Sequence, residues 1–203
     1  IPSSWVTDPR EVPTILSATS APSHRSARKK VGGLIDMGWE IERRFLVEGS
    51  QEHWASLKGG HHLRQGYLTN TKEPSVRIRL GEPGGALLTT KRGKGIRRTE
   101  FESGISKEVA NDLMEAAGAR ILEKIRWTLG PWTLDRFLGS LEGLLLLEIE
   151  LTSEDQNLPP IPDAVNVLRE VTEDNMFTSG ALASLSCADR RELVLAAYTG
   201  RQE

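Results

Sequence analysis

The 203-residue chain has few features that would tie it to a membrane, an oxidising compartment or nucleic acid. Its one cysteine, Cys187, excludes an internal disulfide and fits a reducing compartment. The longest apolar run, Leu144–Leu147, is far shorter than the roughly 18 residues that a membrane-spanning helix needs. A formal net charge of -2 also lacks the basic excess of a typical nucleic-acid-binding protein. We therefore expect a cytoplasmic protein with neither membrane nor nucleic-acid partners, whose oligomeric state the sequence leaves open.

The first 36 residues differ in composition from the remainder of the chain. They are rich in Ser, Pro, Thr and Ala, and neither a helical nor a strand period persists across them. This composition predicts a disordered or loosely packed extension over residues 1–36. The basic cluster at residues 24–30 is typical of a solvated tail, with a targeting or nucleic-acid patch as the alternative. We expect Met37 to be the natural start of a single domain over residues 37–203.

The stretch from Glu40 to Val47 alternates between charged and apolar residues. Successive side chains of an extended strand point to opposite faces, so Glu40, Glu42 and Arg44 share one face. Two carboxylates on one strand face lie about 7 Å apart, and they repel each other unless positive charge lies nearby. A hard divalent cation such as Mg²⁺ or Mn²⁺ takes oxygen ligands and meets that need. The stretch therefore predicts a strand with a candidate metal-binding face.

Alternation of this kind recurs along the chain. Further strands are predicted at residues 61–68, 75–80, 86–91, 96–102, 121–127, 132–137 and 147–151. Helices are predicted at residues 50–58, 106–117 and 190–198, and residues after 153 are expected to cover one end of the fold. The second helix has Ser106 as its N-cap. Its predicted buried stripe consists of Val109, Leu113, Ala116 and Ala117.

Charged side chains predominate on one face of the predicted strands. The acids are Glu40, Glu42, Glu100, Glu102, Asp135, Glu148 and Glu150, and the bases are Arg44, Arg77, Arg79, Lys91, Arg98, Lys124 and Arg126. These faces are either the wet faces of a sandwich or the inside of a barrel. Charge at nearly every second position is unusual for a solvated face, and the opposite faces supply apolar partners for covering helices. We therefore predict an α+β fold, a closed eight-stranded antiparallel β-barrel with a charged lumen and helices packed on the outside.

A lumen lined with both signs of charge has to be wet, because burying an unpaired charge costs several kcal/mol. It also has to hold a multiply charged guest that satisfies both signs. A chain of phosphates does so, since its oxygens bind Arg and Lys, and divalent cations join it to carboxylates. The residues by themselves thus predict a polyanion with a divalent cation as the ligand.

The Glu40-x-Glu42-x-Arg44 motif resembles the Glu-x-Glu-x-Lys signature of the CYTH family, the triphosphate tunnel metalloenzymes, with Arg in place of Lys. Other stretches resemble the family in matching order. They are Gln-Gly-Tyr-Leu at 65–68, Arg-x-Glu-x-Glu at 98–102, Glu-Lys-x-Arg at 123–126 and Glu-Val-Thr at 170–172. The resemblance implies divalent-metal-dependent hydrolysis of a small-molecule triphosphate inside the barrel.

The resemblance also implies roles for the charged residues. Catalysis is expected of Glu40, Glu42, Arg44 and Lys124. Substrate binding is expected of Arg44, Arg77, Arg79, Lys91, Arg98, Lys124 and Arg126. Ligands to Mg²⁺ or Mn²⁺ are expected to be Glu40, Glu42, Asp135, Glu148 and Glu150. Glu100 and Glu102 either assist the attacking water or pair with Arg98, and Arg44 is expected to alter rate or substrate choice relative to a lysine.

Inorganic tripolyphosphate is the substrate that we expect, because few aromatic residues lie on the charged faces to stack against a base. A thiamine triphosphatase and a class IV adenylyl cyclase, both on the same fold, remain alternatives. A non-catalytic module that binds polyphosphate or nucleotide is an alternative of another class. Phosphate release from tripolyphosphate, with cyclic AMP formation from ATP as a second readout, separates these possibilities.

Overall fold

The computed structural model describes residues 29–31, 35–49, 57–69, 74–81, 85–93, 97–163 and 165–199. Most of the helix predicted at residues 50–58 and most of the predicted N-terminal extension lie outside these described residues, and residues 57 and 58 are not helical. No helix in the described ranges is long and apolar enough to cross a membrane.

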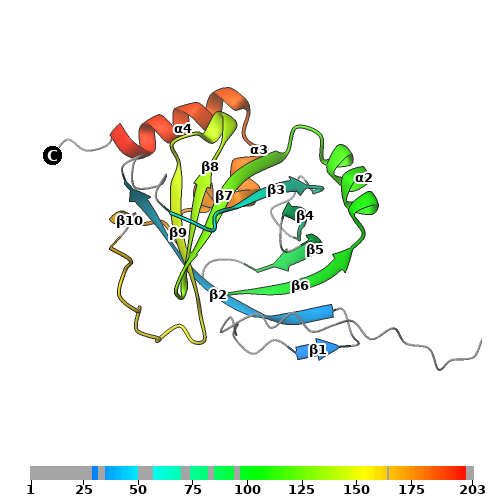
Figure 1. Cartoon of the computed structure of the whole chain (residues 1–203), viewed down its shortest axis with the longest axis horizontal. Helices are drawn as coiled ribbons and strands as arrows, with labels where there is room; N and C mark the ends of the chain where they lie inside the picture. The colour runs from blue at the N-terminus through cyan, green and yellow to red at the C-terminus, as the bar shows by residue number, and fades with distance from the viewer. Residues whose placement is uncertain are drawn as a thin grey trace, which may run out of the picture.

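Eight strands form a closed antiparallel barrel (Figure 1). They are β2 (Ile35–Glu48), β3 (His61–Tyr67), β4 (Ser75–Gly81), β5 (Gly85–Arg92), β6 (Arg97–Ile105), β7 (Ile121–Leu129), β8 (Trp132–Phe137) and β9 (Leu145–Leu151). The order around the barrel is β2-β6-β5-β4-β3-β7-β8-β9, and β9 pairs with β2 to close it. The prediction of an eight-stranded barrel is therefore confirmed, and each stretch predicted to be extended forms one of these strands.

Strand β2 is long enough to change partners, and this change closes the barrel. Its first half pairs with β6 and its second half with β9, and Ile41 pairs with both. β1 (Lys29–Val31) pairs with the start of β2, while β10 (Asn166–Glu170) pairs with its end. Because β2 begins at Ile35 and pairs with β1, strand pairing begins before Met37.

The apolar residues that alternate with the charges lie on the outside of the barrel. One cluster covers β2, β7, β8 and β9 and includes Phe45, Trp127, Trp132, Leu134, Leu147 and Ile149. Leu158, Val165 and Val167, from the segment that follows β9, pack against it. A second cluster joins Ile78 and Ala86 of the sheet to helix α2 (Lys107–Ala117). The opposite, charged faces are consequently turned inward.

Helix α2 begins at its predicted cap but buries a different stripe. The Ser106 side chain accepts a hydrogen bond from the backbone N–H of Val109 at 3.2 Å, which satisfies a free donor of the first turn. The buried residues of the helix are Ala110, Met114 and Ala117. The predicted stripe was therefore correct at Ala117 and in part at Leu113, which is half-buried against the same cluster, and wrong at Ala116 and at Val109, which is 47% exposed. Met114 lies over Gly66, where a Cβ would come within 2.7 Å of its Sδ, so a larger residue at position 66 would force the Met114 side chain to shift.

An apolar cluster closes one end of the lumen. Its members include Leu46, Tyr67, Leu122, Phe137 and Leu146 from the barrel with Val171, Phe177 and Leu182 from the C-terminal segment. That segment contains the short helices η2 (Asn175–Phe177) and α3 (Ser179–Ser184), followed by α4 (Cys187–Thr199). Helices α3 and α4 lie at one end of the barrel, next to β7, β8 and β9 (Figure 1). Residues after 153 thus cover one end of the fold, as predicted.

Candidate functional site

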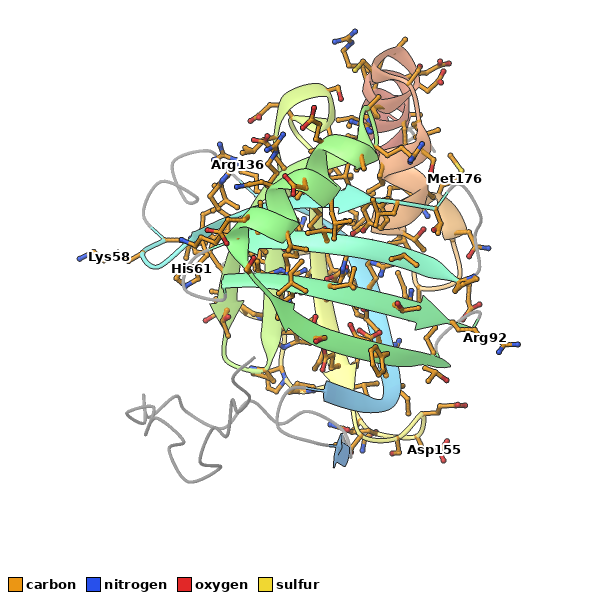
Figure 2. The ribbon with its side chains drawn as sticks, turned by 90° about the vertical axis from the view of Figure 1, so that its right-hand side faces the viewer. Lys58, His61, Arg92, Arg136, Asp155 and Met176 are labelled. Carbon is orange, nitrogen blue, oxygen red and sulfur yellow. The ribbon has the colours of Figure 1, made fainter. Side chains whose placement is uncertain are left out.

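The charged residues that alternate along the strands gather inside the barrel. Those that are buried are Glu40, Glu42, Arg44, Glu100, Glu102, Lys124 and Asp135, and those that are half-buried are Arg77, Arg79, Lys91, Arg98, Arg126 and Glu148. Glu150 is exposed, although it pairs in register with Glu42. Lys58 and Arg92, which were not predicted to belong to the site, point away from the barrel (Figure 2). The structure therefore brings the predicted site residues together, with Glu150 at the exposed edge of the set.

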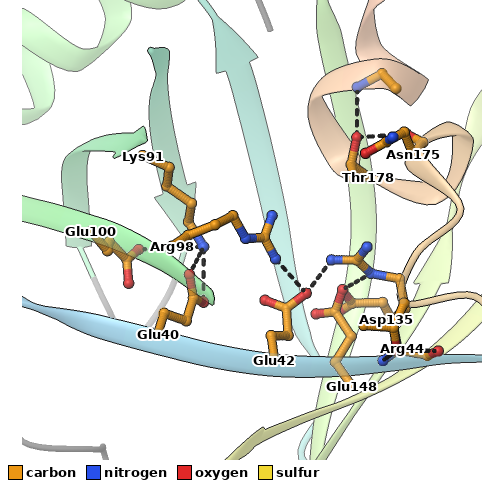
Figure 3. A network of polar contacts seen from close by, with 12 residues as sticks. Glu40, Glu42, Arg44, Lys91, Arg98, Glu100, Asp135, Glu148, Asn175 and Thr178 are labelled. Atoms are coloured by element: carbon orange, nitrogen blue, oxygen red, sulfur yellow. Dashed lines mark hydrogen bonds and ion pairs between the residues drawn. The ribbon is translucent and has the colours of Figure 1, made fainter. Parts of the chain in front are cut away.

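Arg44 joins carboxylates of two neighbouring strands (Figure 3). Its Nε donates to Glu148 Oε1 at 2.8 Å, and its Nη2 donates to Glu42. Arg98 Nη2 lies 3.4 Å from the same Glu42 oxygen. Burial acts to lower the pKa of Arg44, but Glu42 and Glu148 outweigh it and raise the pKa. The guanidinium at the position where the family motif has Lys is therefore a permanent cation between β2 and β9.

Asp135 is fully buried beside two cations of β7. Lys124 Nζ donates to Asp135 Oδ2 at 2.5 Å, and Arg126 Nε donates to Oδ1 at 2.6 Å. Arg126 Nη2 also donates to Glu148 Oε2 at 2.9 Å, which connects this group to Arg44. Burial and the neighbouring Arg126 lower the pKa of Lys124 to about 8, against the attraction of Asp135. An anionic ligand would therefore stabilise the charged form of Lys124.

A second group of ion pairs centres on Lys91. Its Nζ donates to both carboxylate oxygens of Glu40, at 2.9 and 2.7 Å, and lies 3.6 Å from Glu100 Oε1. Arg77 Nη2 lies 3.7 Å from the same Glu100 oxygen. Burial acts to raise the pKa of Glu40, but Lys91 and Arg98 outweigh it and lower the pKa. Glu40 is therefore ionised at neutral pH despite its burial.

Glu102 forms a third group with Thr89 and Arg79. Its Oε1 accepts hydrogen bonds from Thr89 Oγ1 at 2.9 Å and from Arg79 Nη2 at 3.3 Å. Burial and the nearby Arg77 lower the pKa of Arg79 to about 10. Thr89 is completely buried and was missed in the sequence, although it lies two residues before Lys91 and so shares its strand face.

The order of the strands separates the two signs of charge around the lumen. Adjacent strands β9, β2 and β6 carry what we call the acidic wall, Glu40, Glu42, Glu100, Glu102, Glu148 and Glu150. Strands β5, β4 and β7 carry the basic wall, Lys91, Arg77, Arg79, Lys124 and Arg126. β3 lies between β4 and β7 and contributes Gln65. Arg44, Arg98 and Asp135 are the exceptions, and each pairs with opposite charge.

Several buried polar atoms of the described lumen have no hydrogen-bond partner within the protein. They are the Nε atoms of Arg77 and Arg98 and both amide atoms of Gln65. Buried polar groups in folded proteins are nearly always hydrogen-bonded. Donors outnumber acceptors among these atoms, so a ligand rich in acceptor oxygens would satisfy them.

Carboxylates of the acidic wall approach each other in pairs. Across the described ranges, no three His, Cys, Asp or Glu side chains form a cluster suited to a metal ion. Glu100 nevertheless acts to raise the pKa of Glu40, and Glu42 acts to raise that of Glu148, so each pair is close enough to interact. Mg²⁺ is usually held by one or two carboxylates, with water and substrate phosphates completing its shell. The donor set therefore fits a cation that is bound together with a phosphate ligand.

Two curated proteins of similar sequence are both named inorganic triphosphatase. The one from Acetivibrio thermocellus is 36% identical over 151 residues, covering 72% of this chain and 94% of its own length. The one from Nitrosomonas europaea is 37% identical over 155 residues, covering 71% of this chain and 96% of its own length. A crystal structure of an inorganic triphosphatase is 34% identical, with a TM-score of 0.49 and coverage of 72% of this chain and 95% of that one. No family model matches the chain.

Proposed function

Since this chain belongs to the CYTH family, the triphosphate tunnel metalloenzymes, we propose that it hydrolyses a phosphoanhydride bond of a triphosphate inside its barrel. Inorganic tripolyphosphate is the substrate that we propose, as the names of both relatives suggest. The observation that carries the proposal is the segregation of charge in the lumen. The basic wall faces ionised carboxylates, and the buried Nε of Arg77 in this wall has no hydrogen-bond partner among the described residues.

A linear polyphosphate suits the basic wall better than a compact anion does. The cations of this wall lie on β5, β4 and β7, with β3 between the last two, so they form a row rather than a single point. Arg77 and Arg79 present planar guanidinium groups that match phosphate oxygens, and Lys91 and Lys124 add compact charges. Each non-bridging oxygen would form charge-assisted hydrogen bonds with this row. The phosphate chain would therefore lie along the basic wall and leave the acidic wall for its cations.

A divalent cation, Mg²⁺ or Mn²⁺, is the cofactor that we propose for the acidic wall. Its candidate ligands are Glu40, Glu42 and Glu148, of which one or two would hold it together with substrate phosphates, and the exposed Glu150 lies at the edge of the same set. When bound, such a cation would polarise the phosphoryl oxygens and lower the pKa of a coordinated water. Asp135 was predicted as a ligand, but its contacts with Lys124 and Arg126 favour a positioning role instead.

The side chains would then act on the phosphate as follows. Arg126 and Lys124 would stabilise negative charge that develops on the transferred phosphoryl group. Arg44 would keep Glu42 and Glu148 oriented, because it donates to both. Glu100 and Glu102 lie within reach of basic residues and would hold Arg77 and Arg79 in place. Water would attack the terminal phosphorus in line with the leaving phosphate oxygen.

Phosphate release from tripolyphosphate, measured with the purified chain and either Mg²⁺ or Mn²⁺, tests this function. We expect release that depends on the added cation and that chelation abolishes. Thiamine triphosphate and ATP serve as comparison substrates, with cyclic AMP as a further readout for ATP. Tight binding of tripolyphosphate without release would favour a binding module, and cyclic AMP formation would favour a cyclase.

Raising the pH from about 7 to about 9 is expected to weaken tripolyphosphate binding, by at most about tenfold per pH unit above the Lys124 pKa. The reason is that Lys124, with a pKa of about 8, loses the charge that attracts the anion. Titration of binding against pH by calorimetry measures this effect. The Lys124→Met variant should bind more weakly at pH 7 and lose this component of the pH dependence. An unchanged pH profile in the variant would contradict the assignment.

The free energy of unfolding should also depend on the titration of Lys124, but it should increase with pH, whereas tripolyphosphate binding weakens. The ordinary pKa of Lys, 10.5, applies to the unfolded chain, so between about 8 and 10.5 the unfolded state binds a proton that the folded state has lost. The contribution of Lys124 to the free energy of unfolding therefore rises with pH across that window. Urea unfolding of the wild-type protein and of Lys124→Met at several pH values checks the sign.

A further inference from the structure

The side chain of Gln65 is a neutral group at the centre of the basic wall. Only 1% of the residue is exposed, and both its amide oxygen and its amide nitrogen lack a partner among the described residues. A buried amide without hydrogen bonds costs free energy, so the position calls for a ligand or a structural reason.

Strand register places cations on both sides of Gln65. It is the direct partner of Arg79 on β4, and cross-strand partners share a face with Cβ atoms about 5 Å apart. On β7 its partner is Leu122, which puts Lys124 in the diagonal position on the same face. Arg77, the partner of Tyr67, occupies the corresponding diagonal position on β4. Gln65 thus lies among three cations of the basic wall.

A neutral amide keeps these cations available. A glutamate at the same position would pair with Arg79 or Lys124 and cancel part of the positive charge that attracts an anion. Burial and neighbouring positive groups lower the pKa of both Arg79 and Lys124, as expected where positive charge is incompletely neutralised. A hydrogen-bond donor without charge can add to this wall without adding to the repulsion between its cations.

We propose that Gln65 is a substrate-binding residue whose amide N–H₂ donates to an oxygen of the bound phosphate chain, while its carbonyl oxygen accepts from a water bound beside it. The inference rests on the proposed function, because it names a residue of that same site. It predicts that Gln65 lowers the free energy of unfolding of the ligand-free protein and strengthens binding of the anion. A residue present only for packing would instead stabilise the ligand-free protein and leave anion binding unaffected.

Two substitutions separate these possibilities. Gln65→Met keeps the length of the side chain and removes its polar atoms, and Gln65→Glu keeps the shape and adds a negative charge. Gln156→Met is the matched control, because Gln156 accepts a hydrogen bond from Thr152 in the segment after β9, away from the basic wall. Tripolyphosphate binding is measured by calorimetry without added metal, and the stability of the ligand-free protein by urea unfolding.

We expect Gln65→Met to raise the dissociation constant for tripolyphosphate about 10-fold or more, which is the loss expected for one hydrogen bond to a charged group. Gln65→Glu should raise it further, while Gln156→Met should leave it unchanged. The urea midpoint of ligand-free Gln65→Met should stay equal to that of the wild-type protein or rise, and that of Gln65→Glu should rise because the new carboxylate pairs with Arg79 or Lys124.

Wild-type affinity in both Gln65 variants, or a urea midpoint for Gln65→Met below that of the wild-type protein, would overturn the inference alone. Absence of tripolyphosphate binding by the wild-type protein both with and without added Mg²⁺ would overturn the proposed function and, with it, this inference. The wild-type measurement and the variant measurement therefore distinguish the two failures.

Discussion

Phosphate release from tripolyphosphate is expected to fall at least about 100-fold when Glu40 is replaced by Gln, equivalent to about 2.7 kcal/mol of transition-state stabilisation. Glu40 is buried, yet Lys91 and Arg98 lower its pKa, so it contributes a full negative charge to the acidic wall. The substitution keeps the size of the side chain and one oxygen that Lys91 can reach. It removes the charge that would hold the divalent cation.

Stopped-time assays of phosphate release at saturating tripolyphosphate, across a range of Mg²⁺ concentrations, measure the change. Glu170→Gln is the matched control, because Glu170 pairs with Arg43 on the outer side of the barrel. We expect the control to retain the wild-type rate. Undiminished release by Glu40→Gln would remove this residue from the metal site. A requirement for more Mg²⁺ in the variant, with partial recovery of the rate, would support its role as a ligand.

Replacing Asp135 by Asn is expected to destabilise the protein by about 3–5 kcal/mol, the loss typical of breaking a buried ion pair from one side. Asp135 is fully buried and accepts hydrogen bonds from Lys124 and from Arg126. Arg126 retains Glu148 as a partner after the substitution, whereas the ammonium of Lys124 loses its carboxylate contact at 2.5 Å. The free energy of unfolding, measured by urea titration at pH 7, checks the prediction.

A double variant tests the physical cause of that loss. Combining Asp135→Asn with Lys124→Met removes the cation that the first substitution leaves uncompensated, so part of the stability should return. The exposed Asp163 provides the control, since Asp163→Asn should change the free energy of unfolding by less than about 0.5 kcal/mol. Additive losses in the double variant would contradict the view that Asp135 acts mainly by compensating Lys124.

Most of the strands and the membership of the charged face followed from the sequence because both depend on a period of two. Glu40, Glu42 and Arg44 share a face in any extended chain, whatever the strand pairs with. The start of helix α2 could also be predicted from nearby residues, because the cap at Ser106 involves a donor only three residues away. Its buried stripe could not be predicted in this way, because Met114 packs over Gly66 of a strand that is distant in the sequence.

The sequence by itself therefore determined which side chains face the same way, and the tertiary structure decided where that face lies and how its charges are grouped. Closure of the barrel depends on pairing Ile41 with both Arg97 and Leu151, contacts between segments far apart in the chain. Strand order then sets β3 between β4 and β7, so that Gln65 lies among cations. Alternation along one strand carries no information about its neighbours, because register and order are set by packing between strands.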